Sequence, residues 1–160
     1  MDLKLSVLDQ SPIHDDKEPK EGLHDTLKLA KFCEQWGYHR YWCAEHHDTP
    51  GYASATPEIM VSAIASITSK IRVGSGGVML NHYSPYKVAE TFNSINALYG
   101  NRIDLGIGRA PGGAFLSSRA LNDGNNHNYT DKAYDLINFL DDNVRKSIVK
   151  HIKDNSNVFN

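Results

Sequence analysis

Four short apolar runs recur along the chain at a nearly constant interval, and this repeat constrains the fold more than any other feature. The runs are LKLSVL at 3–8, RYWCA at 40–44, IRVG at 71–74 and IDLGI at 103–107. Their first residues lie about 31 to 37 positions apart, which is room for one strand, one helix and two loops. We therefore predict four strands separated by helices.

The segments between these runs carry apolar residues three or four positions apart, the spacing of one helix face. The stripes are Leu23, Leu27, Ala30, Cys33 and Trp36 in the first segment, Met60, Ile64 and Ile67 in the second, and Val88, Phe92, Ile95 and Tyr99 in the third. The expected start signals are Thr56 with Pro57 and Ser84 with Pro85. Gly37 and Gly100 are the expected stops.

A fourth helix is predicted from Thr130, and its stripe would be Ala133, Ile137, Leu140 and Val144. Before it, residues 110–129 form a Gly- and Asn-rich stretch of about twenty residues, and loops of that length are usually functional or disordered. Strands that alternate with helices indicate a parallel sheet, because parallel neighbours need a long crossover. The two candidate architectures are a doubly wound sheet and a (β/α)₈ barrel.

Composition excludes several classes of protein. A length of 160 residues suits about one domain, and a net charge of -2 with scattered Lys and Arg offers no electrostatic footprint for nucleic acid or anionic lipid. The first ten residues lack a secretory signal pattern, and no apolar segment is long enough for a membrane span. Two cysteines make no disulfide framework. We expect a reduced, cytoplasmic protein.

Polar and glycine residues follow every predicted strand. They are Asp9, Gln10 and Ser11 after the first, Glu45, His46, His47 and Asp48 after the second, Ser75, Gly76 and Gly77 after the third, and Gly108 and Arg109 after the fourth. Ligands bind at the carboxyl edge of the sheet in both candidate architectures. We therefore expect all four strands to contribute to one site, although polar residues also follow strands simply because loops are solvated.

The EHHD motif at 45–48 has three interpretations. Neighbouring strand residues point to opposite faces, so Glu45 and His47 should share one side while His46 and Asp48 share the other. This pattern does not match known zinc spacings, which place ligands on one face, and we expect no metal. A histidine that contacts a ligand or transfers protons is favoured, because imidazole exchanges a proton near neutral pH. A structural histidine bonded to a backbone carbonyl is the alternative.

Two glycine-rich motifs favour a bound cofactor. GIGRAPGG at 106–113 fails the G-x-G-x-x-G test of a dinucleotide site, since Pro111 occupies the third glycine's place. Its Arg109 suits a phosphate, although a lone loop arginine is more often a solvated charge. In the tract 74–77 that leaves the third predicted strand, Gly76 and Gly77 would let a planar ring lie against the backbone, and loop flexibility is the alternative.

Taken together, these motifs resemble the bacterial luciferase-like flavin monooxygenase family. The resemblance covers about residues 3–113, from LSVLDQSP through WCAEHHDTPGYASATPEI and VGSGGVMLNHYSP to LYGNRIDLGIGRAPGG. It implies a (β/α)₈ barrel of the TIM type, of which this chain has room for only about the first four βα units. The whole chain, 1–160, would be the N-terminal part of such a barrel domain, and we expect a truncated form or fragment.

The resemblance also implies roles for particular residues. His46 matches the family's catalytic histidine, Gly76 and Gly77 match a non-prolyl cis peptide under the flavin ring, and Arg109 matches an arginine that contacts the FMN phosphate. The arginine favours FMN over a deazaflavin. Gly108 replaces a reactive cysteine of luciferase, which excludes thiol chemistry there.

The implied function is that of an FMN-dependent monooxygenase. A separate flavin reductase would supply reduced FMN, and O₂ would be used to oxidise a small organic substrate such as an aldehyde or alkane. Family members often pair, so a homodimer is possible, and we expect neither nucleic acid nor membrane as a partner. The alternative is a non-catalytic flavin-binding or assembly protein of the same fold.

Overall fold

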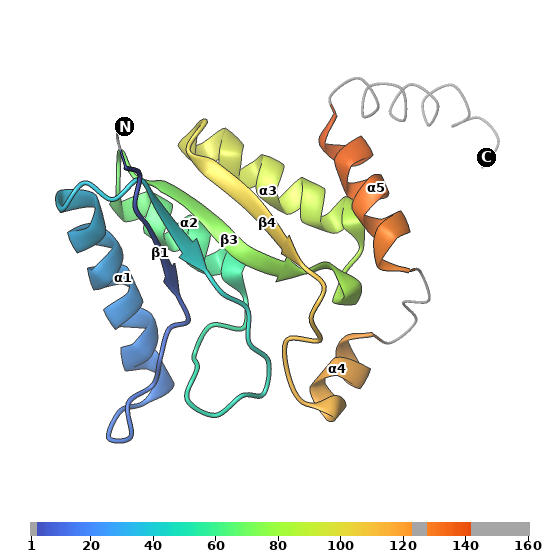
Figure 1. Ribbon diagram of the computed structural model, residues 1–160, viewed down its shortest axis with the longest axis horizontal. Coiled ribbons are helices and arrows are strands. Elements are labelled where there is room, and N and C mark those ends of the chain that lie inside the picture. The colour runs from blue at the N-terminus through green and yellow to red at the C-terminus, as the bar shows by residue number, and fades with distance from the viewer. Residues whose placement is uncertain (1–2, 123–127, 142–160) are drawn as a thin grey trace, which may run out of the picture.

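A computed structural model describes residues 3–122 and 128–141 of the chain (Figure 1). The elements in order are β1 (Ser6–Asp9), α1 (Pro19–Gln35), β2 (Arg40–Cys43), α2 (Pro57–Ile67), β3 (Arg72–Met79), η1 (Leu80–His82), α3 (Pro85–Tyr99), β4 (Ile103–Gly108), α4 (Phe115–Leu121) and α5 (Tyr129–Leu140). The predicted alternation of strand and helix is confirmed. No helix within the described residues is long and apolar enough to cross a membrane.

The four strands form one parallel sheet whose spatial order is β1-β2-β3-β4, the same as their order in the chain. Because crossovers between parallel strands are right-handed, this order winds the sheet in one direction and places the crossover helices on one face. A doubly wound sheet instead reverses its strand order and carries helices on both faces. The architecture is therefore that of a TIM-type barrel, partly present.

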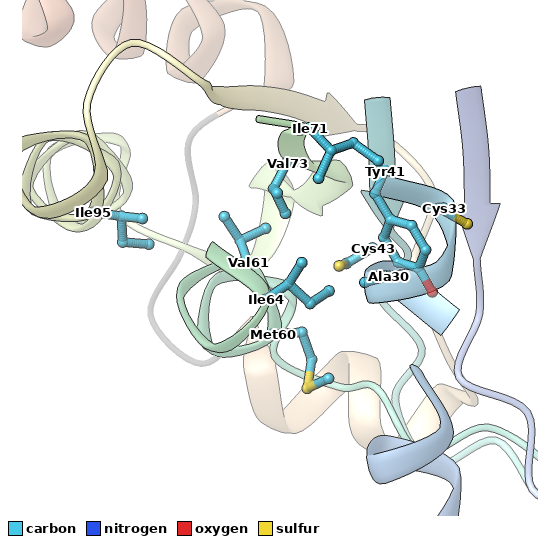
Figure 2. Packing of buried hydrophobic residues seen from close by; sticks show 10 residues of the cluster. All are labelled: Ala30, Cys33, Tyr41, Cys43, Met60, Val61, Ile64, Ile71, Val73 and Ile95. Carbon is cyan, nitrogen blue, oxygen red and sulfur yellow. The ribbon is translucent and has the colours of Figure 1, made fainter. Parts of the chain in front are cut away.

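The main core lies between the helices and the outer face of this sheet (Figure 2). Its buried residues are Ala30 and Cys33 of α1, Tyr41 and Cys43 of β2, Met60, Val61 and Ile64 of α2, Ile71 and Val73 at β3, and Ile95 of α3. Burying such side chains contributes roughly 1.5–3 kcal/mol each for the larger ones. The predicted helix stripes supply most of the helical members.

The predicted start and stop residues of the helices can be compared with the structure at two starts and two stops. Pro57 and Pro85 open their helices as predicted, and the Ser84 hydroxyl accepts a bond from the Lys87 N–H at 3.5 Å. Thr56 occupies the N-cap of α2 as predicted, although its hydroxyl does not accept the bond from a free backbone N–H that favours threonine at such a position. Gly37 and Gly100 have positive φ, 78° and 75°, as expected for glycines that follow a helix.

Three expectations about local structure are wrong. The stretch 110–129 contains a helix, α4, that its Gly and Asn content concealed. In α5 the buried residues are Lys132 and Leu136, whereas Ile137 is 64% exposed, because α5 turns a face one position away from the predicted stripe toward α3 and η1. Trp36 is 65% exposed and stacks on Phe32 outside the core. Val144 lies outside the described residues.

The inner face of the sheet is lined by a row that runs across all four strands. Leu8, Trp42, Gly74 and Asp104 are aligned in register. A Cβ added at Gly74 would stand 2.6 Å from Trp42 Cζ3, so only glycine lets the indole lie against β3. At the amino ends of the strands, Asp104 accepts bonds from the Arg40 and Arg72 guanidinium groups. The inner face thus carries the Trp42 indole and, at its amino end, Asp104 in ion pairs with two arginines.

Candidate functional site

The loops that follow the strands are joined into one surface at the carboxyl edge of the sheet, beside α4 in Figure 1. The His47 N–H donates to the Gly112 carbonyl at 2.7 Å, and His47 forms a parallel bridge with Gly113. The Ala53 N–H donates to the Ser11 carbonyl at 2.9 Å. The β1, β2 and β4 loops therefore hold one another, as the predicted single site requires.

His46 lies half-buried in this surface. Its ring stacks on Tyr52 with 4.5 Å between centroids and 24° between planes, and its backbone N–H donates to the Ser54 carbonyl at 2.9 Å. Among the described residues, no hydrogen bond uses either ring nitrogen of His46. The imidazole is positioned by stacking and keeps both nitrogens available to a ligand.

His47 turns the other way and binds Glu45, as the strand alternation predicted. His47 Nε2 lies 2.6 Å from Glu45 Oε1, and Tyr83 Oη donates to the same oxygen at 2.8 Å. The Met79 N–H donates to Glu45 Oε2 at 2.8 Å. Glu45 is 1% exposed, so this carboxylate joins the end of β2 to the end of β3 from a buried position. We call Glu45, His47 and Tyr83 the Glu45 cluster.

Tyr83 is held from both sides. Burial raises the pKa of its phenol, and the bond to the Glu45 carboxylate raises it further, so the hydroxyl keeps its proton and donates it. Lys132 of α5 is 1% exposed and donates from Nζ to the carbonyls of Asn81 at 2.6 Å and Tyr83 at 3.2 Å. Burial lowers the pKa of Lys132. This lysine fixes the backbone that carries Tyr83.

The Gly76–Gly77 peptide bond is cis, and Gly76 is exposed. A Cβ at Gly77 would lie 2.8 Å from the Ile107 carbonyl carbon, because β3 and β4 approach closely at the register shift between Ser75 and Val78. The glycines lie within β3 rather than in a loop after it, since β3 continues to Met79.

Arg109 directly follows β4 and its side chain is exposed. Its backbone carbonyl accepts a bond from Asn81 Nδ2 at 2.7 Å, which ties the β4 loop to η1. Within residues 3–122 and 128–141, the guanidinium group has no hydrogen bond or ion pair. It is therefore free to meet an anionic group near the carboxyl edge.

Asp9 and Ser11 differ from the predicted site residues. Asp9 is 6% exposed and accepts bonds from Thr26 Oγ1 and Tyr41 Oη, both at 2.6 Å, and from the Ser11 N–H at 2.9 Å. These partners, which we call the Asp9 cluster, join β1 and β2 to α1. The expectation that Asp9 and Ser11 line the site is therefore wrong, because the Thr26 hydroxyl of α1 binds both side chains and the Tyr41 hydroxyl of β2 binds Asp9 in the interior.

Sequence reasoning missed Tyr83 and the role of Glu45. No local pattern pairs them, since their contact crosses 38 positions. Among the described residues there is no group of three or more His, Cys, Asp or Glu side chains that could hold a metal ion. Within the part of the chain that the structure describes, the edge of the sheet instead presents the His46 imidazole and the Arg109 guanidinium, neither with a hydrogen-bond partner, and the exposed Gly76.

Comparisons with known proteins identify the family of the chain. The family model described as luciferase-like monooxygenase matches residues 1–140. N-acetyl-S-alkylcysteine monooxygenase of Bacillus subtilis (strain 168) is 51% identical over 119 residues, which cover 74% of this chain and 36% of that protein. The chain spans less than half the length of the curated relatives it matches.

Solved structures show the same fold. The crystal structure of apo-MsnO8 matches with a TM-score of 0.83 and 44% identity, over 88% of this chain and 43% of that one. The oxygenating constituent of 3,6-diketocamphane monooxygenase from Pseudomonas putida, solved in complex with FMN, matches with a TM-score of 0.73 and 18% identity, over 88% and 39%. On the family match and these identities, the chain belongs to the luciferase-like monooxygenase family.

Proposed function

We propose that this chain supplies the FMN-facing part of a monooxygenase that uses reduced FMN and O₂ to oxidise a small organic substrate such as an aldehyde or alkane. The observation that carries the proposal is the position of His46. Its ring lies at the carboxyl edge, stacked on Tyr52, with no hydrogen bond to either nitrogen among the described residues. A structural histidine would use a ring nitrogen in a hydrogen bond within the protein, so the His46 imidazole fits contact with a ligand better than a structural role.

The residues present fit a flavin. Gly76 is exposed, and a Cβ there would lie 2.9 Å from Trp42 Cβ, so glycine lets the backbone lie close to the indole; the exposed backbone would meet a flat ring. The fold accommodates FMN in the diketocamphane enzyme, although that likeness concerns the fold alone. Arg109 would pair with the phosphate, since a guanidinium fork suits phosphate oxygens. Bound reduced FMN would supply the electrons that activate O₂.

His46 would act as acid or base at the reacting atoms. Stacking on Tyr52 restrains rotation of the ring, and the bond from its N–H to Ser54 fixes the backbone. An imidazole so placed exchanges a proton with a bound reactant without reorganising its surroundings. A separate reductase that delivers reduced FMN, a cytoplasmic location and pairing of two copies belong to the same proposal.

Two substitutions test this function in the purified protein. His46→Ala should slow O₂-dependent oxidation of an aldehyde by about 100-fold or more while reduced FMN still binds. Arg109→Ala should weaken FMN binding by about tenfold, the loss of one charge-assisted contact, and leave riboflavin binding unchanged.

The outcomes separate the alternatives. Unchanged turnover in His46→Ala would remove His46 from the chemistry. Flavin binding without O₂-dependent product would favour a non-catalytic flavin-binding protein. Absence of FMN binding would overturn both.

A further inference from the structure

A cavity of about 60 Å³ lies between α2, β3 and α3, and it adjoins the Glu45 cluster through Tyr83. Its lining residues are Glu58, Val78, Tyr83, Lys87, Val88 and Thr91. A water needs roughly 10–15 Å³ of such space and two or more polar partners. The cavity therefore has room for a few waters, and a carboxyl, a phenol, an ammonium and a hydroxyl can bind them.

Glu58 is the acidic group of this cavity. It lies in the first turn of α2 and is half-buried, in contrast to the exposed acids of the helix surfaces. Burial raises its pKa above the ordinary value of 4.5, and the nearby Glu45 carboxylate raises it further, whereas its own backbone N–H and His47 lower it. Lys87 of α3 is the cation that lines the same cavity.

Tyr83 connects this carboxyl to the carboxyl edge. The Tyr83 side chain lines the cavity, yet its hydroxyl donates to Glu45 Oε1 at 2.8 Å and lies 3.3 Å from His47 Nε2. Glu45 Oε1 in turn lies 2.6 Å from His47 Nε2. The 2.8 Å and 2.6 Å separations, both to Glu45 Oε1, are short enough for proton transfer along a hydrogen bond, whereas the direct Tyr83–His47 contact is longer.

We propose that Glu58 exchanges protons with His47 through cavity water, the Tyr83 hydroxyl and the Glu45 carboxylate. The Glu58 carboxyl releases a proton to water, and water gives one to Tyr83 Oη. Tyr83 passes its own proton to Glu45 Oε1, and Glu45 passes one to His47 Nε2. One proton moves in net from Glu58 to His47, every intermediate group recovers its state, and no electron is transferred.

This route deepens the proposed function, on which its purpose rests. His47 adjoins His46 in the chain, so the relay would bring protons from the cavity between α2 and α3 to the neighbour of the catalytic histidine. Glu58 and Tyr83 are thus proton-exchanging and positioning residues rather than groups that touch the substrate. The relay operates within the chain and needs no flavin to be measured.

A simpler role for Glu58 is distinguishable. An acid in the first turn of a helix stabilises the helix through the dipole, and its removal would then weaken α2 without affecting His47. The relay instead predicts that both Glu58 and Tyr83 control how fast the His47 ring proton exchanges with solvent. That rate is the readout that a purely structural glutamate would not change.

The experiment measures solvent exchange of the His47 Nε2 proton by NMR in the flavin-free protein. Glu58→Gln and Tyr83→Phe should each slow this exchange by about tenfold or more, since each removes one member of the relay. The exposed Asp135→Asn variant, which also removes one negative charge, should leave it unchanged. If Glu58→Gln does not fold, Tyr83→Phe and the carboxyl-retaining Glu58→Asp carry the test.

Slowed exchange in the relay variants, with normal exchange in Asp135→Asn and Glu58→Asp, supports the relay. Unchanged exchange in either Glu58→Gln or Tyr83→Phe overturns it. Because no flavin is added, this result is independent of whether the protein binds FMN, and a failure of FMN binding would contradict the proposed function without touching the relay.

Discussion

The Asp9 cluster and the Glu45 cluster are built alike and differ in what surrounds them. Each centres on a carboxylate, 6% exposed in Asp9 and 1% in Glu45, at or just after the end of neighbouring strands. Asp9 binds two hydroxyls and one backbone N–H and lies among the packed residues of α1. Glu45 binds an imidazole, a phenol and a backbone N–H, and it lies beside a cavity.

The chemical nature of the partners decides whether a buried carboxylate only stabilises the fold or can also take part in proton transfer. Hydroxyl and amide partners have no charge change near neutral pH, so the Asp9 cluster can only hold β1, β2 and α1 together. An imidazole does exchange a proton in that range, and a second carboxyl, Glu58, lies near enough to Glu45 to have its pKa raised by it. We infer that, of these two clusters, the Glu45 cluster exchanges protons with the candidate site and the Asp9 cluster does not.

The largest expected effect is on stability at the Asp9 cluster. Asp9→Ala would leave the hydroxyls of Thr26 and Tyr41 and the Ser11 N–H without their buried acceptor, so we expect a loss of about 3–5 kcal/mol in unfolding free energy. Urea denaturation followed by circular dichroism measures it, with Asp135→Asn as the control. A loss below about 1 kcal/mol would show that the cluster does not hold α1.

A smaller effect is expected at Glu45. Glu45→Gln keeps the shape and one acceptor oxygen, so unfolding free energy should fall by about 1–3 kcal/mol. Because one negative charge disappears beside Glu58, the pKa of Glu58 should move down toward 4.5. NMR titration of the Glu58 Cδ resonance measures this shift, and Asp9→Asn should not produce it. Equal shifts in both variants would erase the distinction between the clusters.

Thiol labelling separates the clusters by a third route. Cys33 and Cys43 are both free and 1% exposed, and burial together with the Asp9 carboxylate raises the pKa of each thiol. A disulfide reagent should therefore react slowly with the native protein. Asp9→Asn should speed the reaction by loosening α1, and Glu45→Gln should leave it nearly unchanged. Faster labelling in Glu45→Gln alone would contradict this assignment.

The smallest expected effect is on the pH dependence of stability, at two glutamates whose pKa values are shifted in opposite directions, Glu58 upward and Glu34 downward. The raised pKa of Glu58 means that its stabilising contribution is present below pH 4.5 and is lost as pH rises through the folded value, so wild type should lose stability relative to Glu58→Gln over that interval. Glu34 accepts three backbone N–H bonds that hold its pKa low despite the opposing effect of burial.

Glu34→Gln should show the reverse trend, because the Glu34 contribution is present above pH 4.5 and is lost as pH falls through its lowered value. Thermal denaturation of the three proteins between pH 3 and pH 7, about the range over which carboxyls titrate, measures both trends. Parallel curves for the two variants would show that neither burial nor the N–H bonds shift these groups in the folded protein.

The sequence predicted the repeating strands and helices well, because hydrophobic spacing and the signals at Pro57, Pro85, Gly37 and Gly100 are local. It also placed Glu45 and His47 on one side through strand alternation alone. What it could not predict depends on distant partners. Tyr83 reaches Glu45 across 38 positions, and Asp9 is withdrawn from the edge by Thr26 of α1, 17 positions away.

Recognition of a family supplied what spacing could not. The interpretation of Gly76–Gly77 as a cis peptide came from the resemblance, and the structure confirms the bond. The roles assigned to His46, Gly76, Gly77 and Arg109 stay predictions. They share a location, the carboxyl edge of the sheet, which the strand order required before any side chain was placed.

The central claim is that this edge, and not the Asp9 cluster, receives FMN. Titrating ¹⁵N-labelled protein with reduced FMN under anaerobic conditions and following the backbone amide resonances tests it directly. We predict saturable shifts at His46, Gly76, Gly77 and Arg109, while Thr26 is unaffected. Shifts centred on Thr26 and α1, or no shifts at all, would contradict the account.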